Sequence, residues 1–427
     1  MKRFDPEPHP EIPRDARAPN LSTPAIFLRF LRFGLSAWGG PTAQISALRE
    51  ALVEREHWTD EDHFRRALAV YQALPGPEAH ELCCWFGMNA GGRAGAIAAG
   101  LGFMLPGFTL MLLAAWAYRR FGLGDAVLSG AFWGAQAVVV GLVLAAALRL
   151  TRSITRAAGT STKTGWFAWL VVAAAAASQG VGGPFWLALP TGGAALALAA
   201  RRRAAAAVVV VMASLFVALW MRGPDGAAAV PAQPSQRSPV ARVVPLPELA
   251  ATGLTGGLVS FGGAYTAIPV VRTITTASDG WMTDREFLDG VAIGSVLPAP
   301  LVIFATFCGY LGNGFFGAMA MTAGMFLPAF AFTLLGHGLI EKLVEHRAAH
   351  AFLDGIACAV CGLVVTTGLQ LLAGLTRPTA LVSSDITRLA PIAIAMTTFI
   401  ALPRLRNRAA VPILMGIGAV VGLSIGP

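Results

Sequence analysis

Apolar residues dominate the chain in long runs that recur from one end to the other, separated by short polar connections. The runs form thirteen segments, near residues 22–46, 66–88, 94–117, 126–148, 165–181, 184–200, 204–221, 247–271, 287–309, 312–336, 350–373, 387–402 and 410–426. About 20 apolar residues span a bilayer as a helix, whereas a membrane β-barrel would need short alternating runs. The pattern therefore predicts an all-α polytopic integral membrane protein with about 13 transmembrane segments.

Composition supports this class of protein and excludes a nucleic-acid partner. The 427 residues are 55% hydrophobic and 13% charged, while soluble proteins carry about 25% charged residues. The net charge of +9 comes from arginines that lie singly or in short clusters between apolar runs, as orientation signals do. Their distribution predicts a cytoplasmic N-terminus and, after thirteen crossings, a C-terminus on the periplasmic side.

A stretch rich in proline, glycine and alanine, GPDGAAAVPAQPSQRSPVARVVPLP, follows the seventh segment and has the composition of a linker. It divides the chain into two parts of similar length. The predicted divisions are a polar cytosolic tail at 1–20, a first repeat at 21–222, the linker at 223–246 and a second repeat at 247–427. About seven segments fall in the first repeat and six in the second.

The two halves repeat each other. A shift of 223 residues aligns GLSAWGGPTAQI, from Gly34, with GLVSFGGAYTAI, from Gly257, without a gap. The same shift aligns LPGP at 74–77 with LPAP at 297–300. Because seven segments, an odd number, precede the second copy, the copies are expected to face opposite ways across the membrane. Inverted repeats with interrupted helices are typical of secondary transporters.

Each copy contains two predicted helix breaks, one at the Gly-Gly motif and one at the Pro-x-Pro motif. In a membrane such breaks are found where they are packed in protein or line a wet cavity. A helix that restarts at Pro75 or Pro298 presents free N–H groups and a positive dipole end to an anion. The expected substrate-binding residues, with nearby neutral donors included, are Gly39, Gly40, Pro41, Thr42, Gln72, Pro75, Gly76, Pro77, Gly262, Gly263, Tyr265, Thr266, Ser295, Pro298, Ala299 and Pro300. The alternative is that these motifs only kink helices for packing.

Titratable residues follow the first Pro-x-Pro motif, where the second copy is apolar. Ionised Glu78 would compete with a dianion for the same helix end, and its protonation would remove the repulsion. Glu78 is therefore the first candidate for proton coupling, and Glu81 is the second. The alternative for Glu78 is an ordinary acid in the first helical turn. His80 has either a functional role or a position at the membrane surface.

Three arginines are candidates for attracting anions. Arg49 aligns with Arg272, so the two are expected at opposite mouths of the pathway, unless they are ordinary loop charges. Arg29 lies inside the first segment, close to its predicted cytoplasmic end. It is expected either to extend to that surface or to draw anions into the pathway.

Other polar residues are interpreted as marking helix starts. Thr59 with Asp62, and Thr283 with Glu286, fit the S/T-x-x-D/E capping pattern, one position out of register between the copies. Asp289 precedes a glycine near the start of an apolar segment and is interpreted as a helix-start acid. The five cysteines lie inside apolar segments, which favours packing over disulfides or metal binding.

The motifs FGLSAWGGP, QALPGP and LGFMLPGF in the first half, with FGGAY, FLDGV and LPAPLVIF in the second, resemble the chromate ion transporter family. The resemblance extends from about Phe27 over the rest of the chain and is to the long, two-domain members. It implies an inner-membrane protein associated with chromate resistance by efflux, with sulfate as a competitor. Ala264 and Ala299 depart from the first copy, which has Pro41 and Gly76.

The sequence and the resemblance together predict a secondary active transporter of a tetrahedral oxyanion, chromate first. Sulfate or another oxyanion is the alternative substrate, and an intramembrane enzyme or a sensor is the remote alternative. The motifs HExxH and GxSxG and the phosphate loop GxxxxGK[ST] do not occur, so the prediction is no enzyme, no cofactor and no use of ATP. Helix faces rich in glycine and alanine permit contact within or between chains, so a homodimer stays open.

Overall fold

The computed structural model describes residues 18–122, 126–158, 162–201, 203–221, 243–260, 264–277, 279–345, 347–376, 385–405 and 409–425. Nearly all of this part of the chain is helical, as the sequence predicts. Most of the predicted tail, 1–20, and most of the predicted linker, 223–246, lie outside the described residues.

Apart from one additional helix and a few short turns, the described helices of the two halves follow each other in the same order. The first half comprises α1 (Thr23–Leu35), α2 (Gly40–Leu48), the π-helix η1 (Arg49–Arg55), α3 (Glu61–Ala73), α4 (Glu78–Phe121), α5 (Ala126–Ala158), α6 (Thr162–Gly180), α7 (Phe185–Ala200) and α8 (Ala204–Met221). The second comprises α9 (Leu246–Val259), the 3₁₀ turn η3 (Ala264–Thr266), α10 (Ala267–Thr275), α11 (Asp284–Val296), the 3₁₀ turn η4 (Leu301–Ile303), α12 (Phe304–Glu345), α13 (Arg347–Leu375), α14 (Asp385–Ala401) and α15 (Ala410–Ile425). Helix α8 is additional to the first half.

Helices α4 and α12 each fold back on themselves. Gly92 of α4 and Gly314 of α12 have φ angles of 61° and 56°, in the left-handed region that favours glycine. His80 Nε2 lies 3.2 Å from the Gly100 carbonyl oxygen, although 20 residues of straight helix would separate them by about 30 Å. Each element is therefore a hairpin with a short first arm, residues 78–90 in α4 and, with η4, residues 301–312 in the second half.

Equivalent hydrogen bonds join the start of each half to the end of its short arm. The backbone N–H of Leu21 donates to the carbonyl of Ala90 at 3.0 Å. In the second half, the N–H of Val244 donates to the carbonyl of Gly312, also at 3.0 Å. The sequence repeat between the halves is therefore accompanied by a repeat of the backbone arrangement.

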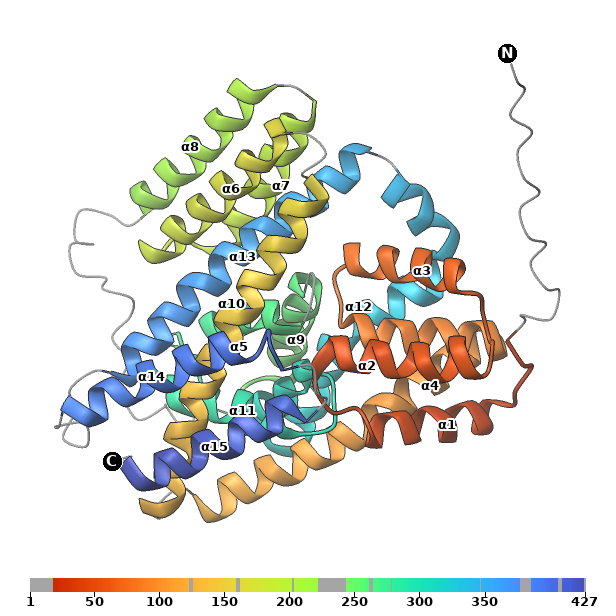
Figure 1. Ribbon diagram of the computed structural model, residues 1–427, viewed down its shortest axis with the longest axis horizontal. Helices are drawn as coiled ribbons and strands as arrows, with labels where there is room; N and C mark the ends of the chain where they lie inside the picture. The colour runs from red at the N-terminus through yellow and green to blue at the C-terminus, as the bar shows by residue number, and fades with distance from the viewer. Residues whose placement is uncertain are drawn as a thin grey trace.

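The halves exchange helices. Helix α5 of the first half packs against α14 and α15 of the second, and α13 of the second packs against α6 and α7 of the first. Figure 1 shows α6, α7 and α8 grouped beside α13. Glycines permit these close approaches, because a side chain at Gly134 would meet the backbone of Gly418, and one at Gly355 would meet that of Gly192. The two halves are therefore interlocked.

Several described helices have the length and composition of membrane spans. Four stretches are long and apolar enough to cross a bilayer, 78–121, 129–152, 301–334 and 351–375, and the first and third contain the hairpin turns. Shorter apolar helices lie at 166–180, 185–200, 204–220, 389–401 and 410–425. Large apolar side chains such as Phe216 and Trp220 of α8 are exposed, as expected for surfaces that face lipid.

Four predicted segments are not continuous helices. In the first half, the segment at 22–46 is divided between α1 and α2, and the segment at 66–88 between α3 and the first arm of α4. In the second half, the segment at 247–271 is divided between α9 and α10, and the segment at 287–309 between α11 and α12. All four divisions fall at the predicted glycine and proline breaks. The count of thirteen crossings stays a prediction.

Candidate functional site at the helix breaks

The first break separates α1 from α2. Gly39 and Gly40 have φ angles of 94° and 79°, which a residue with a side chain rarely adopts. Pro41 follows in the first turn of α2, where its missing N–H removes no helical hydrogen bond. This local sequence ends one helix and begins another.

The second break separates α3 from α4 and restarts later than predicted. Helix α4 begins at Glu78 with Pro77 at its N-cap, and in the second half Pro300 precedes η4 in the same way. The predicted restarts at Pro75 and Pro298 were both wrong, because the residue before a proline avoids the helical conformation. Gly76 precedes Pro77 and has a φ of 154°, so the helix cannot begin before Pro77.

The breaks of the two halves contact each other. The N–H of Gly76, in the second break of the first half, donates to the carbonyl of Ser260, at the first break of the second half, at 2.8 Å. The converse contact is made by Gln44 of α2, whose Nε2 donates to the carbonyls of Ala37 and Ala299 at 2.9 and 3.0 Å. In addition, η3 packs against η4. All four breaks therefore meet in one region.

Gln44 is a buried polar residue that was not predicted from the sequence. Its side chain is 2% exposed, and its Oε1 has no hydrogen-bond partner among the described residues. The aligned residue in the second half is Ala267. The alignment of the repeats, which pairs polar Gln44 with apolar Ala267, could therefore have identified this residue.

The acids beside the first Pro-x-Pro motif are buried at this meeting point. Glu78 is 7% exposed, and its carboxylate is hydrogen-bonded by the side chain of Gln72. Glu81 is fully buried, and neither of its carboxylate oxygens has a hydrogen-bond partner within the described part of the chain. Its carboxylate lies beside the backbone of Gly76, because a Cβ added there would collide with Oε1. Two carboxyl groups thus lie at the break, and within the described residues a hydrogen-bond partner, Gln72, is present for Glu78 but not for Glu81.

His80 lies inside the molecule, and the expectation that it could face the membrane surface was wrong. Its ring is fully buried between the arms of α4 and the second arm of α12. The centroids of Phe326 and Phe330 lie 4.9 and 4.8 Å from its own, and Cys84 Sγ lies 3.8 Å from its Nδ1. Helix packing explains this position.

The remaining predicted binding residues differ in where they lie. Tyr265 and Thr266 of η3 are buried at the meeting point, as are Pro75, Pro298, Ala299 and Pro300. By contrast, Thr42 is exposed, and the hydroxyl of Ser295 donates to the carbonyl of Val291 at 2.8 Å. Gly262 and Gly263 lie outside the described residues.

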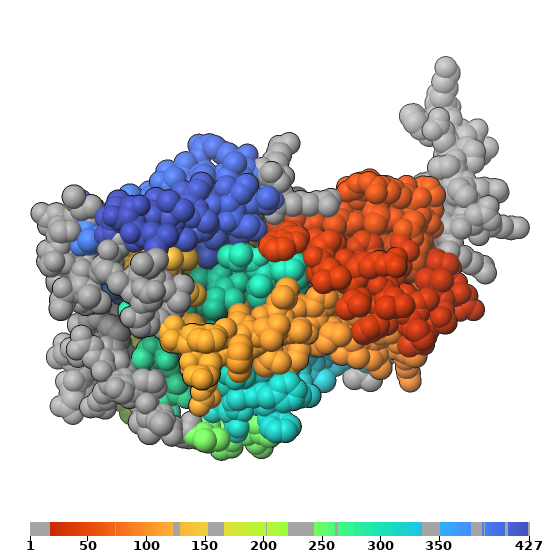
Figure 2. Space-filling view, turned by 90° about the horizontal axis from the view of Figure 1, so that it is seen from below, coloured from red at the N-terminus to blue at the C-terminus, as the bar shows by residue number. Residues whose placement is uncertain are grey.

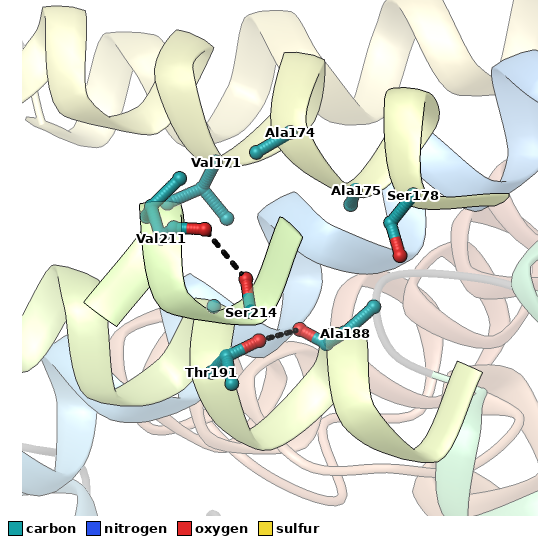
Figure 3. A pocket seen from close by; sticks show the side chains of 9 residues that line it. Val171, Ala174, Ala175, Ser178, Ala188, Thr191, Val211 and Ser214 are labelled. Carbon is teal, nitrogen blue, oxygen red and sulfur yellow. Dashed lines mark hydrogen bonds between the residues drawn. The ribbon is translucent and has the colours of Figure 1, made fainter. Parts of the chain in front are cut away.

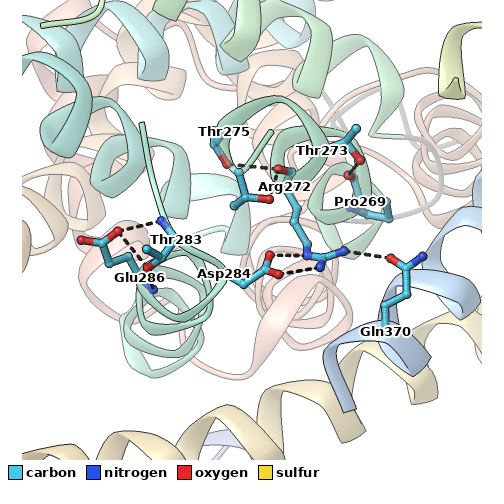
Figure 4. A network of polar contacts seen from close by, with 9 residues as sticks. Pro269, Arg272, Thr273, Thr275, Thr283, Asp284, Glu286 and Gln370 are labelled. Atoms are coloured by element: carbon cyan, nitrogen blue, oxygen red, sulfur yellow. Dashed lines mark hydrogen bonds and ion pairs between the residues drawn. The ribbon is translucent and has the colours of Figure 1, made fainter. Parts of the chain in front are cut away.

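Arg49 and Arg272 make equivalent ion pairs. Arg272 donates to both carboxylate oxygens of Asp284, at 2.8 and 2.9 Å, and to Gln370 at 2.9 Å (Figure 4). Arg49 donates to Glu61, the aligned acid, at 2.9 Å, and this hydrogen bond raises the pKa of the guanidinium. Each arginine thus ties the helix after the first break to the helix before the second.

Arg29 is also engaged. It forms an ion pair with Glu56 of the connection after η1, and its guanidinium lies 5.2 Å from the ring of Trp58. The Arg29 side chain thus pairs within the protein instead of extending to a membrane surface. The pair holds α1 against the connection after η1.

Two expectations about helix starts need correction. Thr283 and Glu286 form the predicted capping box of α11, but α3 is capped by Asp60, which accepts from the N–H of His63 at 2.7 Å. Asp60 aligns with Thr283, so the caps are in register. Asp289 is not a helix-start acid, because it lies in the second turn of α11 and is fully buried.

A small cavity lies elsewhere, between α6, α7 and α8 (Figure 3). It is lined by Val171, Ala174, Ala175, Ser178, Ala188, Thr191, Gly192, Val211 and Ser214. The hydroxyls of Thr191 and Ser214 donate to carbonyls of their own helices, at 2.7 and 2.8 Å. With no charged residue in its lining, this cavity is a poor candidate for an anion.

Comparison with known proteins identifies the family. The family model described as Chromate transporter matches residues 24–228 and, separately, residues 247–423. The chain belongs to the chromate transporter family. It is accordingly a multi-pass membrane protein, and the predicted resemblance is confirmed.

Three relatives cover most of the chain. The chromate transport protein of Pseudomonas aeruginosa is 44% identical over 84% of this chain and 83% of its own. That of Cupriavidus metallidurans is 29% identical over 81% and 82%, and the probable chromate transport protein of Synechococcus elongatus is 28% identical over 80% and 83%. No solved structure matches the chain.

Proposed function

We propose that this chain is a secondary active transporter that moves chromate out of the cell across the inner membrane and so confers chromate resistance. The observation that carries the proposal is the meeting of four helix breaks, two from each half, around buried polar groups. Transporters of this kind bind substrate where interrupted helices of two repeats meet. The names of the three relatives support chromate as the substrate.

An inverted arrangement of the two halves is part of the proposal. The long second arm of α4 begins beside its own short arm, since a side chain at Gly95 would meet the backbone of Gly87. Further along, Gly107 packs against Ala299, and near its end Arg119 donates to the carbonyl of Tyr310 at 3.5 Å. It thus runs from the hairpin turn of the first half, past the breaks, toward the hairpin turn of the second. This path supports hairpin turns on opposite faces of the membrane. In Figure 2 the orange of α4 crosses the visible face, with green-to-cyan segments of the second half on both sides.

The lengths of the short helices support a site near the middle of the bilayer. Helix α1 has 13 residues and α9 has 14, so each is about 20 Å long. The hydrocarbon core is about 30 Å thick. A helix of this length that starts at the surface ends well inside the membrane, which is where we place the breaks. The distribution of arginines supports a cytoplasmic N-terminus and a periplasmic C-terminus, and the repeat supports domains at 21–222 and 247–427.

Binding of the anion rests on the restarted helices. The N-terminal ends of the short arms at Glu78 and Leu301 lie at the meeting point, and their dipoles favour negative charge. Glu78 and Glu81 oppose a dianion when they are ionised. Protonation of one carboxylate therefore accompanies binding, so transport of the anion is coupled to protons. Sulfate has the same shape and charge and is the second candidate substrate.

The test is chromate uptake into inverted membrane vesicles that contain this chain. We expect uptake to depend on an imposed pH gradient and to be reduced by excess sulfate. Vesicles that contain the Gly76→Ala variant, whose break is distorted, serve as the matched control. Uptake equal to that of vesicles without the protein would contradict chromate as substrate, and labelled sulfate in the same vesicles would then test the alternative.

A further inference from the structure

A second buried acid lies away from the helix breaks. Asp289 of α11 is fully buried, and its two carboxylate oxygens accept hydrogen bonds from two different helices of the other half. Gln136 Nε2 of α5 donates to Oδ1 at 2.6 Å, and the Tyr118 hydroxyl of α4 donates to Oδ2 at 2.8 Å. The three residues therefore join the second half to the first.

Both bonded neighbours of Asp289 are neutral. The charged groups that act on it are Arg285 and Glu286 of its own helix. Helix α12 faces it with Phe307, which lies against Gly290 and 5.0 Å from the Tyr118 ring. No titratable residue occurs in α15, and α10 contributes Arg272, already paired with Asp284. A buried carboxylate that no bonded cation compensates is energetically unfavourable and is usually retained for a function.

The three residues can hold a proton without moving. A tyrosine hydroxyl either donates to a carboxylate or accepts from a carboxylic acid, whereas a glutamine NH₂ donates to a carbonyl oxygen in either case. When a proton from water binds Oδ2, the new O–H donates to the Tyr118 oxygen, and the tyrosine hydroxyl hydrogen rotates away. Gln136 continues to donate to Oδ1. Release returns the proton to water, and no other bond forms or breaks.

We propose that Asp289 binds and releases a proton during the transport cycle, as a second coupling residue beside the acids at the breaks. The proposal rests on the proposed function, because it assigns Asp289 to proton-coupled transport. Its position supports the role: Tyr118 is three residues from the end of α4, and Asp289 is five residues from the start of α11. Asp289 therefore lies near the ends of two helices, whereas Glu78 and Glu81 lie at the breaks.

Asparagine at position 289 imitates the protonated acid. Its Nδ2–H donates to the Tyr118 oxygen and its Oδ1 accepts from Gln136, so the Asp289→Asn variant is expected to fold. In proteoliposomes, we expect it to exchange chromate across the membrane at a rate within about twofold of the wild type. Net uptake driven by a pH gradient should fall at least about tenfold and lose its dependence on pH. Asp354→Asn, which changes another acid that precedes a glycine, is the matched control and should retain both.

A spectroscopic measurement keeps this test separate from the identity of the substrate. Infrared difference spectra of the full-length protein in lipid, recorded as the pH is lowered, report the C=O band of newly formed carboxylic acids. We expect one component of that band to be absent in Asp289→Asn, retained in Asp354→Asn, and shifted in Tyr118→Phe, which removes one hydrogen bond. Identical spectra for wild type and Asp289→Asn would overturn the proposal, as would unchanged pH dependence of uptake in that variant. Absence of chromate exchange in the wild type, with the band component lost in Asp289→Asn, would contradict chromate as substrate and leave proton binding at Asp289 supported.

Discussion

The Pro-x-Pro break has the same backbone role in both halves but very different surroundings. In the first half, Glu78, His80 and Glu81 follow the break, and Gly76 provides the conformation between the prolines. In the second half the break is followed by the apolar residues of η4, and Ala299 replaces the glycine. Both copies of the repeat therefore have the Pro-x-Pro break, but only in the first copy is the break followed directly by titratable residues. Under the proposed function, both copies contribute helix ends to anion binding, and charge compensation at the breaks belongs to the first copy.

The largest effect is expected at Gly76. Alanine there would have to adopt a φ of 154° and would meet the Glu81 carboxylate. Such backbone strain costs about 1–3 kcal/mol. We expect Gly76→Ala to lower the initial rate of uptake by about tenfold or more. The reciprocal change Ala299→Gly should stay within about twofold, because alanine already fits there. Equal effects at the two positions would show that the breaks do not differ as described.

The ion pairs of Arg272 and Arg49 should differ in strength. The side chains of Arg272 and Asp284 are 13% and 22% exposed, whereas those of Arg49 and Glu61 are 45% and 34% exposed. Loss of the more buried pair in Arg272→Ala should lower the free energy of unfolding by about 3 kcal/mol. Arg49→Ala should change it much less, because solvent screens the exposed pair. Thermal unfolding of the purified variants measures both. A large drop in chromate uptake with unchanged stability in Arg49→Ala would instead favour the predicted anion-attracting role.

A smaller effect is expected at Gln44. Its side chain joins a break of the first half to a break of the second, as the backbone N–H of Gly76 does for the other two breaks. Gln44→Ala removes the donor from the carbonyls of Ala37 and Ala299. The lost hydrogen bonds correspond to about 1 kcal/mol, or about a fivefold reduction in uptake. Gln179→Ala, which removes an amide from α6 away from the breaks, should leave uptake unchanged. If Gln44→Ala is also unaffected, the contact between the breaks does not limit transport.

Local features of the sequence predicted much of this architecture. The Gly-Gly and Pro-x-Pro motifs marked the breaks correctly, because proline and glycine act on the backbone of their own segment. The capping box at Thr283 was correct for the same reason. At Asp60 the pattern selected a neighbouring residue, because several capping side chains lie in succession there.

Contacts between the halves could not be predicted in this way. Gln44 and Asp289 owe their roles to partners 255 and 153 residues distant, in the other half of the chain. A pattern within one segment carries no information about such a partner. The same limit applies to the exchange of α5 and α13 between the halves, and to the folding back of α4, which depends on two adjacent residues, Gly91 and Gly92.

The most direct test of the central claim is the pH dependence of chromate uptake in proteoliposomes for the wild type and Glu78→Gln. Glutamine has the size of the protonated acid but cannot ionise. If the Pro-x-Pro break of the first half couples binding of the dianion to a proton, the variant should still exchange chromate, while gradient-driven uptake loses its dependence on pH. Leu301→Gln, at the aligned position of the second half, should leave the pH dependence intact. An unchanged pH dependence in Glu78→Gln would contradict the assignment of charge compensation at this site to Glu78.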